Sequence, residues 1–559
     1  MRTWSKMILL LLATVLGFGF DAVVAQSTGN ITGRVLNAES GRALAGAHVL
    51  IDGTSYGAAT SQSGTYRLRQ IPPGEYTLVV RYIGFTEKRE EITLSTGQSL
   101  ELDFELNPAA VEGEDVVVTA LAEGRTRALN IQRSSNNIRN VISTEQLEQF
   151  ADPNLSGALS RISGVSFQTD RGEAGEVYLR GLSPNLSNVT MNGAQMASTD
   201  TDGREVWLGG MTGDIVTNLE VIKAVTPDMD ANTIGGTINI DTNENIGDSP
   251  IFRANLSGGI SQLSDKGQGQ VGIQYGQRFG DLQVFMTGSY QNNNRETHDI
   301  RQEQYDWDFG DGSSSVQNVL EEQRLSTYVI PRKRYGGSLQ LNYDLNRDHS
   351  IYLRTLFNRF DDSQTRNQHR IELDREDPIT RTVAPDARFQ VDGRTYERQL
   401  TSYSAIFGGD SGFSRFDLAY RVAYSRGVYD EPFRDYFRFR HATGATVEYE
   451  DRNEFYYPQL WVTDGTNVTD PANYEFTYYE ERVTYSQDDD IAANFDVTTN
   501  LSIGDRNLEL KFGALGRYKV KDHEFSRDRY DFIGDENVSL GRFATFDNRT
   551  FLNRFSKFT

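Results

Sequence analysis

Residues 416–424 read FDLAYRVAY, an alternation of large apolar residues with polar or small ones that decides the fold class of the second half of the chain. Successive side chains of a strand point to opposite faces, so one face of this segment is apolar. The alternation recurs, often with aromatic ends, at residues 252–257, 282–290, 338–343, 351–357 and 509–515. Segments of about ten residues with one apolar face suit strands of a lipid-facing barrel. We therefore expect residues 250–559 to form a partial outer-membrane β-barrel.

The connections between these segments alternate in length. Short turns are expected at residues 279–281 and 345–348, whereas polar stretches at 296–324, 361–398 and 433–487 are read as long loops. Short turns at one rim and long loops at the other are typical of outer-membrane barrels. A soluble β-sandwich or propeller remains the alternative.

A segment of mixed α/β character, residues 128–246, precedes the strands. Ser143 and Gln146 form a capping box for a helix through Phe150, and a second helix begins at Asp152-Pro153 and closes at Gly164. A third helix is expected near residues 214–218. Strands are predicted at residues 177–180, 188–191, 219–223 and 235–240, and the second of them ends in an Asn192-Gly193 turn.

The first region after the N-terminus, residues 29–107, shows short alternating strands separated by Gly and Pro, as in a small antiparallel sandwich. Strands are expected at 31–35, 47–51, 65–68, 76–82, 90–94 and 100–106. The residues Gly64-x-Tyr66-x-Leu68, Pro73-Gly74-x-Tyr76 and Tyr82-Ile83-Gly84-Phe85 resemble the carboxypeptidase-regulatory-like domain, a transthyretin-like β-sandwich. The resemblance implies a binding or spacer module.

An ordered series in residues 128–246 is similar to the plug domain of TonB-dependent outer-membrane receptors. It comprises Leu155-x-x-Ala158-Leu159, Gly164-Val165, Leu179-Arg180-Gly181, Met191-Asn192-Gly193, Leu219-x-Val221-Ile222-Lys223 and Gly235-Gly236-Thr237-Ile238-Asn239-Ile240. The candidate plug-motif residues are Arg180, Gly181, Asn192, Gly193, Gly235, Gly236 and Asn239. The resemblance implies a 22-stranded barrel around the plug.

Between the sandwich and the plug lies a linker, residues 108–127, with an isolated apolar run. Three valines favour an extended backbone, and an exposed strand is suited to pairing with a partner. The resemblance makes this run the TonB box, comprising Asp115, Val116, Val117, Val118, Thr119 and Ala120. Residues 107–113 and 122–127 would be flexible tethers. A first strand of the following domain is the alternative.

The N-terminus is predicted to be a signal peptide, residues 1–25, because Arg2 and Lys6 precede an apolar run and Val23-Val24-Ala25 offers a cleavage site. A retained anchor is the alternative. The chain has no Cys, which excludes disulfides and thiolate metal sites. The net charge of −22 argues against general nucleic-acid binding.

Motifs for catalysis or metal binding are weak. Gly409-Asp410-Ser411-Gly412 is read as a hairpin loop, and His369-Arg370-Ile371-Glu372 as a chance match to zinc-ligand spacing. The pair Asp361-Asp362 is read as solvated loop. We expect neither an enzyme nor a cofactor.

The number of strand candidates is smaller than the resemblance implies. About nine or ten are found where 22 are expected, and an open barrel leaves backbone groups unsatisfied in lipid. We expect the chain to be a C-terminally incomplete receptor, with a smaller barrel as the alternative.

The function implied by the resemblance is TonB-dependent active transport of a ligand across the outer membrane, with the N-terminal domain in the periplasm. The expected partners are TonB with its ExbB/ExbD energising complex, outer-membrane lipid and a surface glycan-binding lipoprotein. An oligosaccharide is the preferred ligand, because plug stretches such as residues 181–185, 191–194 and 198–204 look closest to a subgroup often linked to oligosaccharide uptake. An iron chelate such as a siderophore, a peptide ligand, and a non-transporting surface binder or signal transducer are the alternatives.

Overall fold

The computed structural model describes residues 28–109, 120–149, 154–308, 317–450, 458–503, 506–533 and 538–542. The chain divides into two compact units. The first is Met1–Glu114 with Phe413–Asp417 and Thr498–Lys511, and the second is Asp115–Gly412, Leu418–Val497 and Phe512–Thr559. Each unit is described by itself.

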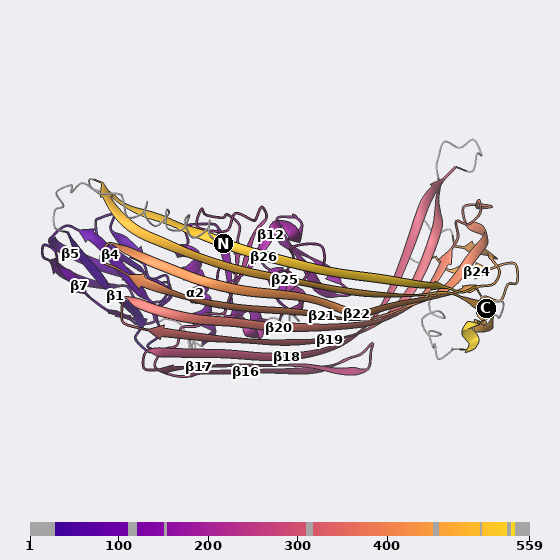
Figure 1. The fold of residues 1–559 in the computed structure, drawn as a ribbon, viewed down its shortest axis with the longest axis horizontal. Coiled ribbons are helices and arrows are strands. Elements are labelled where there is room, and N and C mark those ends of the chain that lie inside the picture. The colour runs from indigo at the N-terminus through magenta and orange to yellow at the C-terminus, as the bar shows by residue number, and fades with distance from the viewer. Residues whose placement is uncertain are drawn as a thin grey trace, which may run out of the picture. The chain divides into compact units, whose positions relative to one another are not determined.

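The first unit contains a β-sandwich of two four-stranded sheets (Figure 1). One sheet consists of β1 (Gly29–Asn37), β4 (Thr65–Ile71), β7 (Ser99–Glu101) and β8 (Phe104–Leu106). The other has the order β3 (Gly57–Ala59), β2 (His48–Ile51), β5 (Gly74–Arg81) and β6 (Lys88–Leu94). Alternate residues of β1 are buried, as the period of two predicts, and Ile31 and Val35 enter one core with residues from both sheets. Five of the six predicted strands are confirmed, whereas the predicted strand 100–106 is the two short strands β7 and β8, which pair with β1 in parallel and not antiparallel, and β3 was not predicted.

The plug segment of the second unit is built on a five-stranded sheet. Its order is β13 (Ala194–Gln195), β12 (Ser187–Met191), β15 (Gly236–Asp241), β14 (Asn218–Ile222) and β9 (Arg139–Ser143), and β10 (Val165–Asp170) forms a separate hairpin with β11 (Glu173–Leu179). The helices are α2 (Ala120–Ser134), α3 (Thr144–Glu148) and α4 (Leu155–Leu159), with single 3-10 turns η1 (Pro184–Leu186), η2 (Leu208–Gly210) and η3 (Gly213–Ile215).

Several local predictions for the plug segment are confirmed, and others differ. The capping box before α3 is present, with the Ser143 N–H donating to Gln146 Oε1 at 3.2 Å. The second helix begins later than predicted, at Leu155 after the N-cap Asn154. The helix predicted near 214–218 is only the single 3-10 turn η3, and strand β14 begins at Asn218. Residues 150–153, where one helix was expected to end and the next to begin, lie outside the described residues.

The large sheet of the second unit is antiparallel and has nine strands on its main path. They are β16 (Ile251–Ser261), β17 (Lys266–Phe279), β18 (Leu282–Trp307), β19 (Gln317–Asp344), β20 (His349–Glu372), β21 (Val383–Gly412), β22 (Phe416–His441), β25 (Tyr474–Ile503) and β26 (Arg506–Asp531). The small strand β23 (Ala445–Tyr449) pairs with β21, and β24 (Leu460–Val462) pairs with β23. Two short 3-10 turns, η4 (Pro471–Asn473) and η5 (Leu540–Arg542), follow in the chain. Within the described ranges, β16 and β26 are the two edges of this path, and no pairing joins them.

The strands of the large sheet are much longer than the sequence pattern indicated. The short turns at 279–281 and 345–348 are confirmed, but large parts of the predicted loops 296–324, 361–398 and 433–487 are strand. Gly409–Gly412 also belong to β21, and Gly409, Asp410 and Ser411 pair with β20, so this segment is not a hairpin loop. These extensions are rich in polar residues but also contain buried apolar ones such as Leu320, Phe389 and Phe439, and their backbones pair across the ladder.

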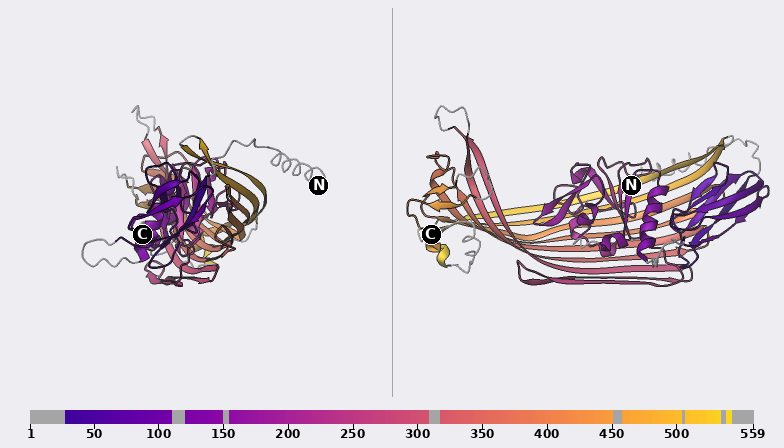
Figure 2. Two further views of the ribbon diagram at one scale, coloured as in Figure 1. Left: turned by 90° about the vertical axis from the view of Figure 1, so that its left-hand side faces the viewer. Right: turned by 180° about the vertical axis from the view of Figure 1, so that it is seen from behind.

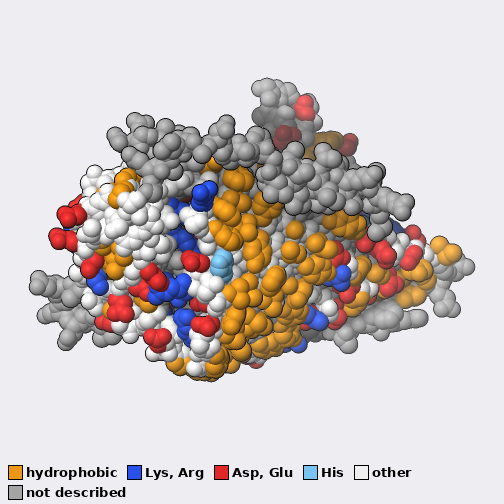
Figure 3. All heavy atoms as spheres, turned by 60° about the vertical axis from the view of Figure 1, so that its left-hand side comes forward, with side chains coloured by type: hydrophobic (Ala, Val, Ile, Leu, Met, Phe, Trp, Pro, Cys, Tyr) orange, Lys and Arg blue, Asp and Glu red, His pale blue; other side chains and the backbone are white. Residues whose placement is uncertain are grey.

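The two faces of the large sheet differ in character. On β16, the exposed fractions of Phe252, Leu256 and Ile260 are 70%, 83% and 71%. Phe357 and Tyr403, which are paired across β20 and β21, are also exposed, and apolar side chains gather into a band on this face (Figure 3). The sheet curves, and the plug elements lie against its other face (Figure 2). Within the described ranges, the chain has no helix both long and apolar enough to cross a membrane.

Candidate functional site

Arg180 and Gly181 form a tight turn directly after β11. Both have positive φ angles, 55° and 73°, which is strained for the arginine. The Arg180 side chain donates from Nε to the carbonyl oxygen of Gly235 at 3.1 Å and from Nη2 to the carbonyl oxygen of Lys223. The arginine therefore holds this turn against the segments that enter β15 and leave β14.

Asn192, Gly193 and Asn239 form a second hydrogen-bonded unit. Asn192 (φ 47°) and Gly193 (φ 78°) make the predicted two-residue turn between β12 and β13. Asn192 Nδ2 donates to Thr242 Oγ1 at 2.9 Å, and the Gly193 N–H donates to Asn239 Oδ1 at 2.9 Å. The large sheet also contacts this turn, because Arg421 Nη1 on β22 donates to the Asn192 carbonyl oxygen at 3.1 Å.

Gly235 and Gly236 lie where the chain enters β15 beside β12 and β14. A Cβ on Gly235 would come within 2.5 Å of Ser187 Oγ, and one on Gly236 within 2.6 Å of the Ile222 carbonyl oxygen. Gly236 also has a φ of 135°, a conformation that is almost restricted to glycine. The glycine pair thus permits the close packing of three plug strands.

The predicted TonB box falls almost wholly outside the described residues. Asp115, Val116, Val117, Val118 and Thr119 are not described, and Ala120 is the first residue of α2. Residues 122–127, expected to be a flexible tether, are part of this helix. The segment is rich in Ala, Leu, Glu and Arg, which favour helix, and Arg127 Nη1 pairs with Glu244 Oε1 at 2.7 Å.

A buried carboxylate, Glu220 on β14, lies beside the plug-motif residue Asn239. Asn239 Nδ2 donates to Glu220 Oε2 at 3.4 Å, and Arg139 Nη1 lies 3.3 Å from the same oxygen. Burial and the nearby Asp241 raise the pKa of Glu220 to about 7, although Arg139 opposes the shift. Glu220 therefore titrates near neutral pH inside the plug sheet.

The β10–β11 hairpin is joined to the large sheet by a buried ion network. Glu173 Oε2 lies 2.6 Å from Arg332 Nη1 and 2.9 Å from Arg334 Nη2, and Asp170 Oδ2 lies 2.6 Å from Arg332 Nη2. Burial alone would raise the pKa of Glu173, but Arg334 and Arg332 outweigh it and lower that pKa to about 2. Removing one member of such a network leaves the others charged and unpaired.

The network continues across the large sheet to β21. Asp362 on β20 accepts from Arg332 Nε at 2.9 Å and from Arg398 Nη2 at 2.5 Å. Asp362 was read as a solvated loop residue, but its side chain is fully buried between these arginines. No group of three His, Cys, Asp or Glu side chains suited to a metal ion occurs within the described ranges.

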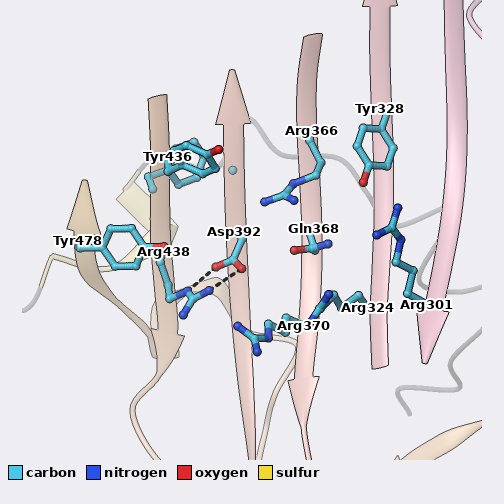
Figure 4. A pocket seen from close by; sticks show the side chains of 12 residues that line it. Arg301, Arg324, Tyr328, Arg366, Gln368, Arg370, Asp392, Tyr436, Arg438 and Tyr478 are labelled. Atoms are coloured by element: carbon cyan, nitrogen blue, oxygen red, sulfur yellow. Dashed lines mark hydrogen bonds and ion pairs between the residues drawn. The ribbon is translucent and has the colours of Figure 1, made fainter. Parts of the chain in front are cut away.

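A cavity of about 210 Å³ lies further along the same strands. Five arginines and one carboxylate are among its lining residues, and its strands are β18 to β22 and β25 (Figure 4). The lining comprises Arg301, Arg324, Tyr328, Arg366, Gln368, Arg370, Asp392, Gly393, Tyr436, Phe437, Arg438 and Tyr478. The arrangement can bind a ligand that is both anionic and able to pack on aromatic rings.

One side chain connects this cavity to the plug. Tyr328 lines the cavity, and the guanidinium carbon of the plug residue Arg171 lies 4.2 Å from the centre of its ring. Arg171 has a positive φ of 49° in the tip of the β10–β11 hairpin, next to Asp170 of the ion network. A ligand in the cavity would therefore lie close to the part of the plug that is bonded to the sheet.

Sequence reasoning missed the arginine-lined cavity and the ion network. Arg366, Gln368 and Arg370 were assigned to a loop, although their spacing of two residues places them on one face of a strand. The Arg332-x-Arg334 spacing carries the same signal. Arginine at alternate positions was the sign that could have revealed both features.

Comparisons with known proteins agree with the two domain resemblances. The CarboxypepD_reg-like domain family matches residues 31–118, and the TonB-dependent Receptor Plug Domain family matches residues 131–237. The first match includes the valines of the predicted TonB box. The chain thus contains a carboxypeptidase-regulatory-like domain followed by a plug domain of the TonB-dependent receptor class, and the resemblance expected from the sequence is confirmed.

Two curated relatives are TonB-dependent receptors of Formosa agariphila. Receptor P3 is 23% identical over 250 residues, which are 44% of this chain and 23% of that protein. Receptor P39 is 26% identical over 183 residues, which are 32% of this chain and 16% of that protein. The matches therefore span less than a quarter of the length of these relatives.

Solved structures that match part of this chain include the ferric citrate transporter FecA in its unliganded form and BauA, the ferric preacinetobactin receptor from Acinetobacter baumannii. FecA is 10% identical with a TM-score of 0.29, and the match covers 72% of this chain and 79% of FecA. BauA is 11% identical with a TM-score of 0.30, and the match covers 71% of this chain and 61% of BauA. Likeness at this level says nothing about the ligand of this chain.

Proposed function

We propose that this protein acts in TonB-dependent active transport of a ligand across the outer membrane. The observation that carries the proposal is a plug domain bonded by buried charges to one face of a long antiparallel sheet, whose other face bears an apolar band. An exposed apolar band on a β-sheet suits contact with lipid. A plug that obstructs the inner face requires energy to be moved, and a transporter needs such a gate.

The orientation follows from the lengths of the connections. Short connections join β17 to β18, β19 to β20 and β21 to β22, whereas those at the opposite rim include the long segment between β22 and β25. Outer-membrane barrels place short turns in the periplasm. We assign the short-turn rim and the N-terminal sandwich to the periplasm, where TonB with ExbB/ExbD would pair with residues Val116 to Thr119.

An oligosaccharide is the ligand we favour, with an iron chelate as the alternative. Tyr305 and Trp307 on β18 lie with ring centroids 6.0 Å apart, and Trp461 on β24 is half-buried. Such rings offer flat apolar faces to sugars. A surface glycan-binding lipoprotein would be the partner of this uptake. We propose no catalytic role.

The first experiment compares Val117→Pro with Val111→Pro in cells that express the receptor from its native gene. Proline removes a ladder hydrogen bond and disfavours strand pairing, so Val117→Pro should abolish uptake and leave surface binding of ligand unchanged. Val111→Pro changes the same linker outside the predicted TonB box and should transport normally.

Normal uptake by Val117→Pro would overturn the assignment of the box. Uptake that persists in cells lacking TonB would overturn the transport mechanism itself. A receptor that binds ligand at the surface but supports no uptake in the unmodified strain would favour the surface binder or signal transducer.

A further inference from the structure

We propose that the arginine-lined cavity binds a ligand carrying several carboxylate or sulfate groups, so that the transported molecule is an anionic oligosaccharide. This inference rests on the proposed transport function and specifies its substrate class. The chain as a whole has a net charge of −22, so a concentration of five arginines around one cavity runs against its overall charge balance.

The cavity faces the same side of the sheet as the plug. Arg332 and Arg334 on β19 reach Glu173 of the plug, and Arg324 and Tyr328 lie at even spacings from them on the same strand. Residues at even spacing share one face of a strand. The cavity therefore opens on the inner face and not on the apolar band.

The position along the strands also suits a ligand that enters from outside. Arg370 lies two residues from the end of β20, and Arg438 lies three residues from the end of β22. Both ends belong to the rim opposite the short turns, which we have assigned to the cell exterior. A ligand would meet this cavity before it meets the plug.

Four of the five arginines pair with carboxylates of the protein. Arg438 pairs with Asp392 at 2.6 Å, and Arg301 with Asp299 at 2.9 Å. Arg324 and Arg370 share Glu322, although Arg324 also lies 2.9 Å from Glu303, and Arg370 lies 3.2 Å from Glu372. Asp392 is the one acidic residue among the lining side chains.

Arg366 is the cavity arginine with the fewest contacts that would explain its presence by stability alone. Among the residues that the structure describes, it makes no ion pair, and its Nε is buried without a hydrogen-bond partner. Its register partner on β21 is Arg394, whose Nε is also buried without a partner. Arg394 lies outside the cavity lining, and its Nη2 donates to Gln364 Oε1, so Arg366 is the arginine whose charge an anionic ligand in the cavity would neutralise.

The aromatic residues distinguish a saccharide from a small inorganic anion. Tyr328, Tyr436, Phe437 and Tyr478 line the cavity together with the arginines, and Arg438 lies 5.4 Å from the ring centre of Tyr478. Aromatic rings contact the faces of sugars while arginines bind planar carboxylates or sulfates in a bidentate manner. A single phosphate would use the charges but not the rings.

The test measures surface binding in de-energised cells that express the receptor from its native gene. The probes are labelled hexagalacturonate, a sulfated hexasaccharide, neutral maltohexaose and ferric citrate. We expect an anionic hexasaccharide to bind at least roughly tenfold more tightly than maltohexaose at low salt, and this preference to shrink as salt is raised.

Arg366→Gln and Arg370→Gln should each weaken that binding by roughly 10- to 100-fold, as expected for loss of a charge-assisted hydrogen bond. Arg359→Gln is the matched control. Arg359 lies on the same strand but at an odd spacing from Arg366, is 41% exposed and pairs with Asp361 at 2.7 Å. Surface abundance and heat-modifiable migration show whether each variant is folded, and the two cavity variants check each other.

Equal binding of maltohexaose and both anionic hexasaccharides, or unchanged binding in both cavity variants, would overturn the inference. Binding of ferric citrate alone, lost in Arg366→Gln, would support the anionic site and overturn the oligosaccharide. Failure of the transport function would appear separately, as uptake that does not depend on TonB while binding at the cavity persists.

Discussion

At the scale of single residues, two glutamates of the plug show opposite electrostatics. Two arginines of β19 lower the pKa of Glu173 to about 2, so this carboxylate stays charged. Burial in the plug sheet and the nearby Asp241 raise the pKa of Glu220 to about 7. Glu173 therefore stabilises the attachment of the plug at all ordinary pH values. Glu220 makes the stability of the plug depend on pH near neutrality.

We predict that Glu220→Gln stabilises the plug above neutral pH. An acid whose pKa is raised from 4.5 to about 7 contributes most to stability below pH 4.5, and that contribution is lost as pH rises to 7. The loss amounts to roughly 3 kcal/mol. Pulse proteolysis of the receptor in urea should show a plug midpoint that falls between pH 4.5 and about 7 in the unmodified protein and stays flat in Glu220→Gln.

Glu90→Gln on β6 is the control, because this exposed glutamate belongs to the N-terminal sandwich and not to the plug sheet. A pH dependence that survives in Glu220→Gln would assign the effect to another group, such as Glu205, whose pKa is raised to about 8 by burial, Glu176 and Asp200.

At the scale of elements, the glycines of the plug set how closely its strands approach. Gly181 and Gly236 both have positive φ angles, but a Cβ on Gly181 would meet nothing within 4 Å, whereas one on Gly236 would strike the Ile222 carbonyl oxygen. Both positions require a backbone conformation with positive φ, but only Gly236 lacks room for a Cβ atom.

We predict that Gly236→Ala destabilises the plug by roughly 3 kcal/mol or more, and Gly181→Ala by roughly 1 to 2 kcal/mol. Hydrogen exchange of the β12, β14 and β15 amides in the complete receptor should rise much more in the first variant, because these strands must separate to admit the methyl group. Equal effects of the two substitutions would show that the contact with Ile222 carries no weight.

At the scale of the whole molecule, the plug is joined to the large sheet by charges and by smaller polar contacts. Thr212 in the plug and Ser289 on β18 lie with their hydroxyl oxygens 2.7 Å apart. These 559 residues contain no Cys, so a disulfide introduced here meets no competing thiol among them.

We predict that the double variant Thr212→Cys and Ser289→Cys loses transport when oxidised and regains it when reduced, with ligand binding unchanged in both states. The disulfide ties the plug to the sheet and prevents the displacement that the proposed mechanism requires. The single variant Thr212→Cys is the control. Full uptake by the oxidised double variant would mean that this part of the plug stays in place during transport.

Local sequence signals determined much of this protein. The alternation of β1, the capping box at Ser143 and Gln146 and the Asn192-Gly193 turn all depend on neighbouring residues, because side-chain periodicity, helix capping and turn conformation are short-range effects. The order of the plug motifs was enough to indicate the plug domain. The TonB box, the closure of a 22-stranded barrel and the signal peptide stay predictions.

The tertiary structure alone decided the length of the β18–β22 strands, the ion network at Glu173 and the arginine-lined cavity. The strand extensions outside the apolar band mix many polar residues with buried apolar ones such as Phe389 and Phe439, and the cross-strand pairing shows that the strands continue there. The cavity is assembled from six strands, four of which supply its arginines, and these lie up to 137 residues apart in the sequence, from Arg301 to Arg438. Their side chains meet because the antiparallel register of the strands places them at the same height along the sheet. No single segment of the sequence contains the information that sets this register.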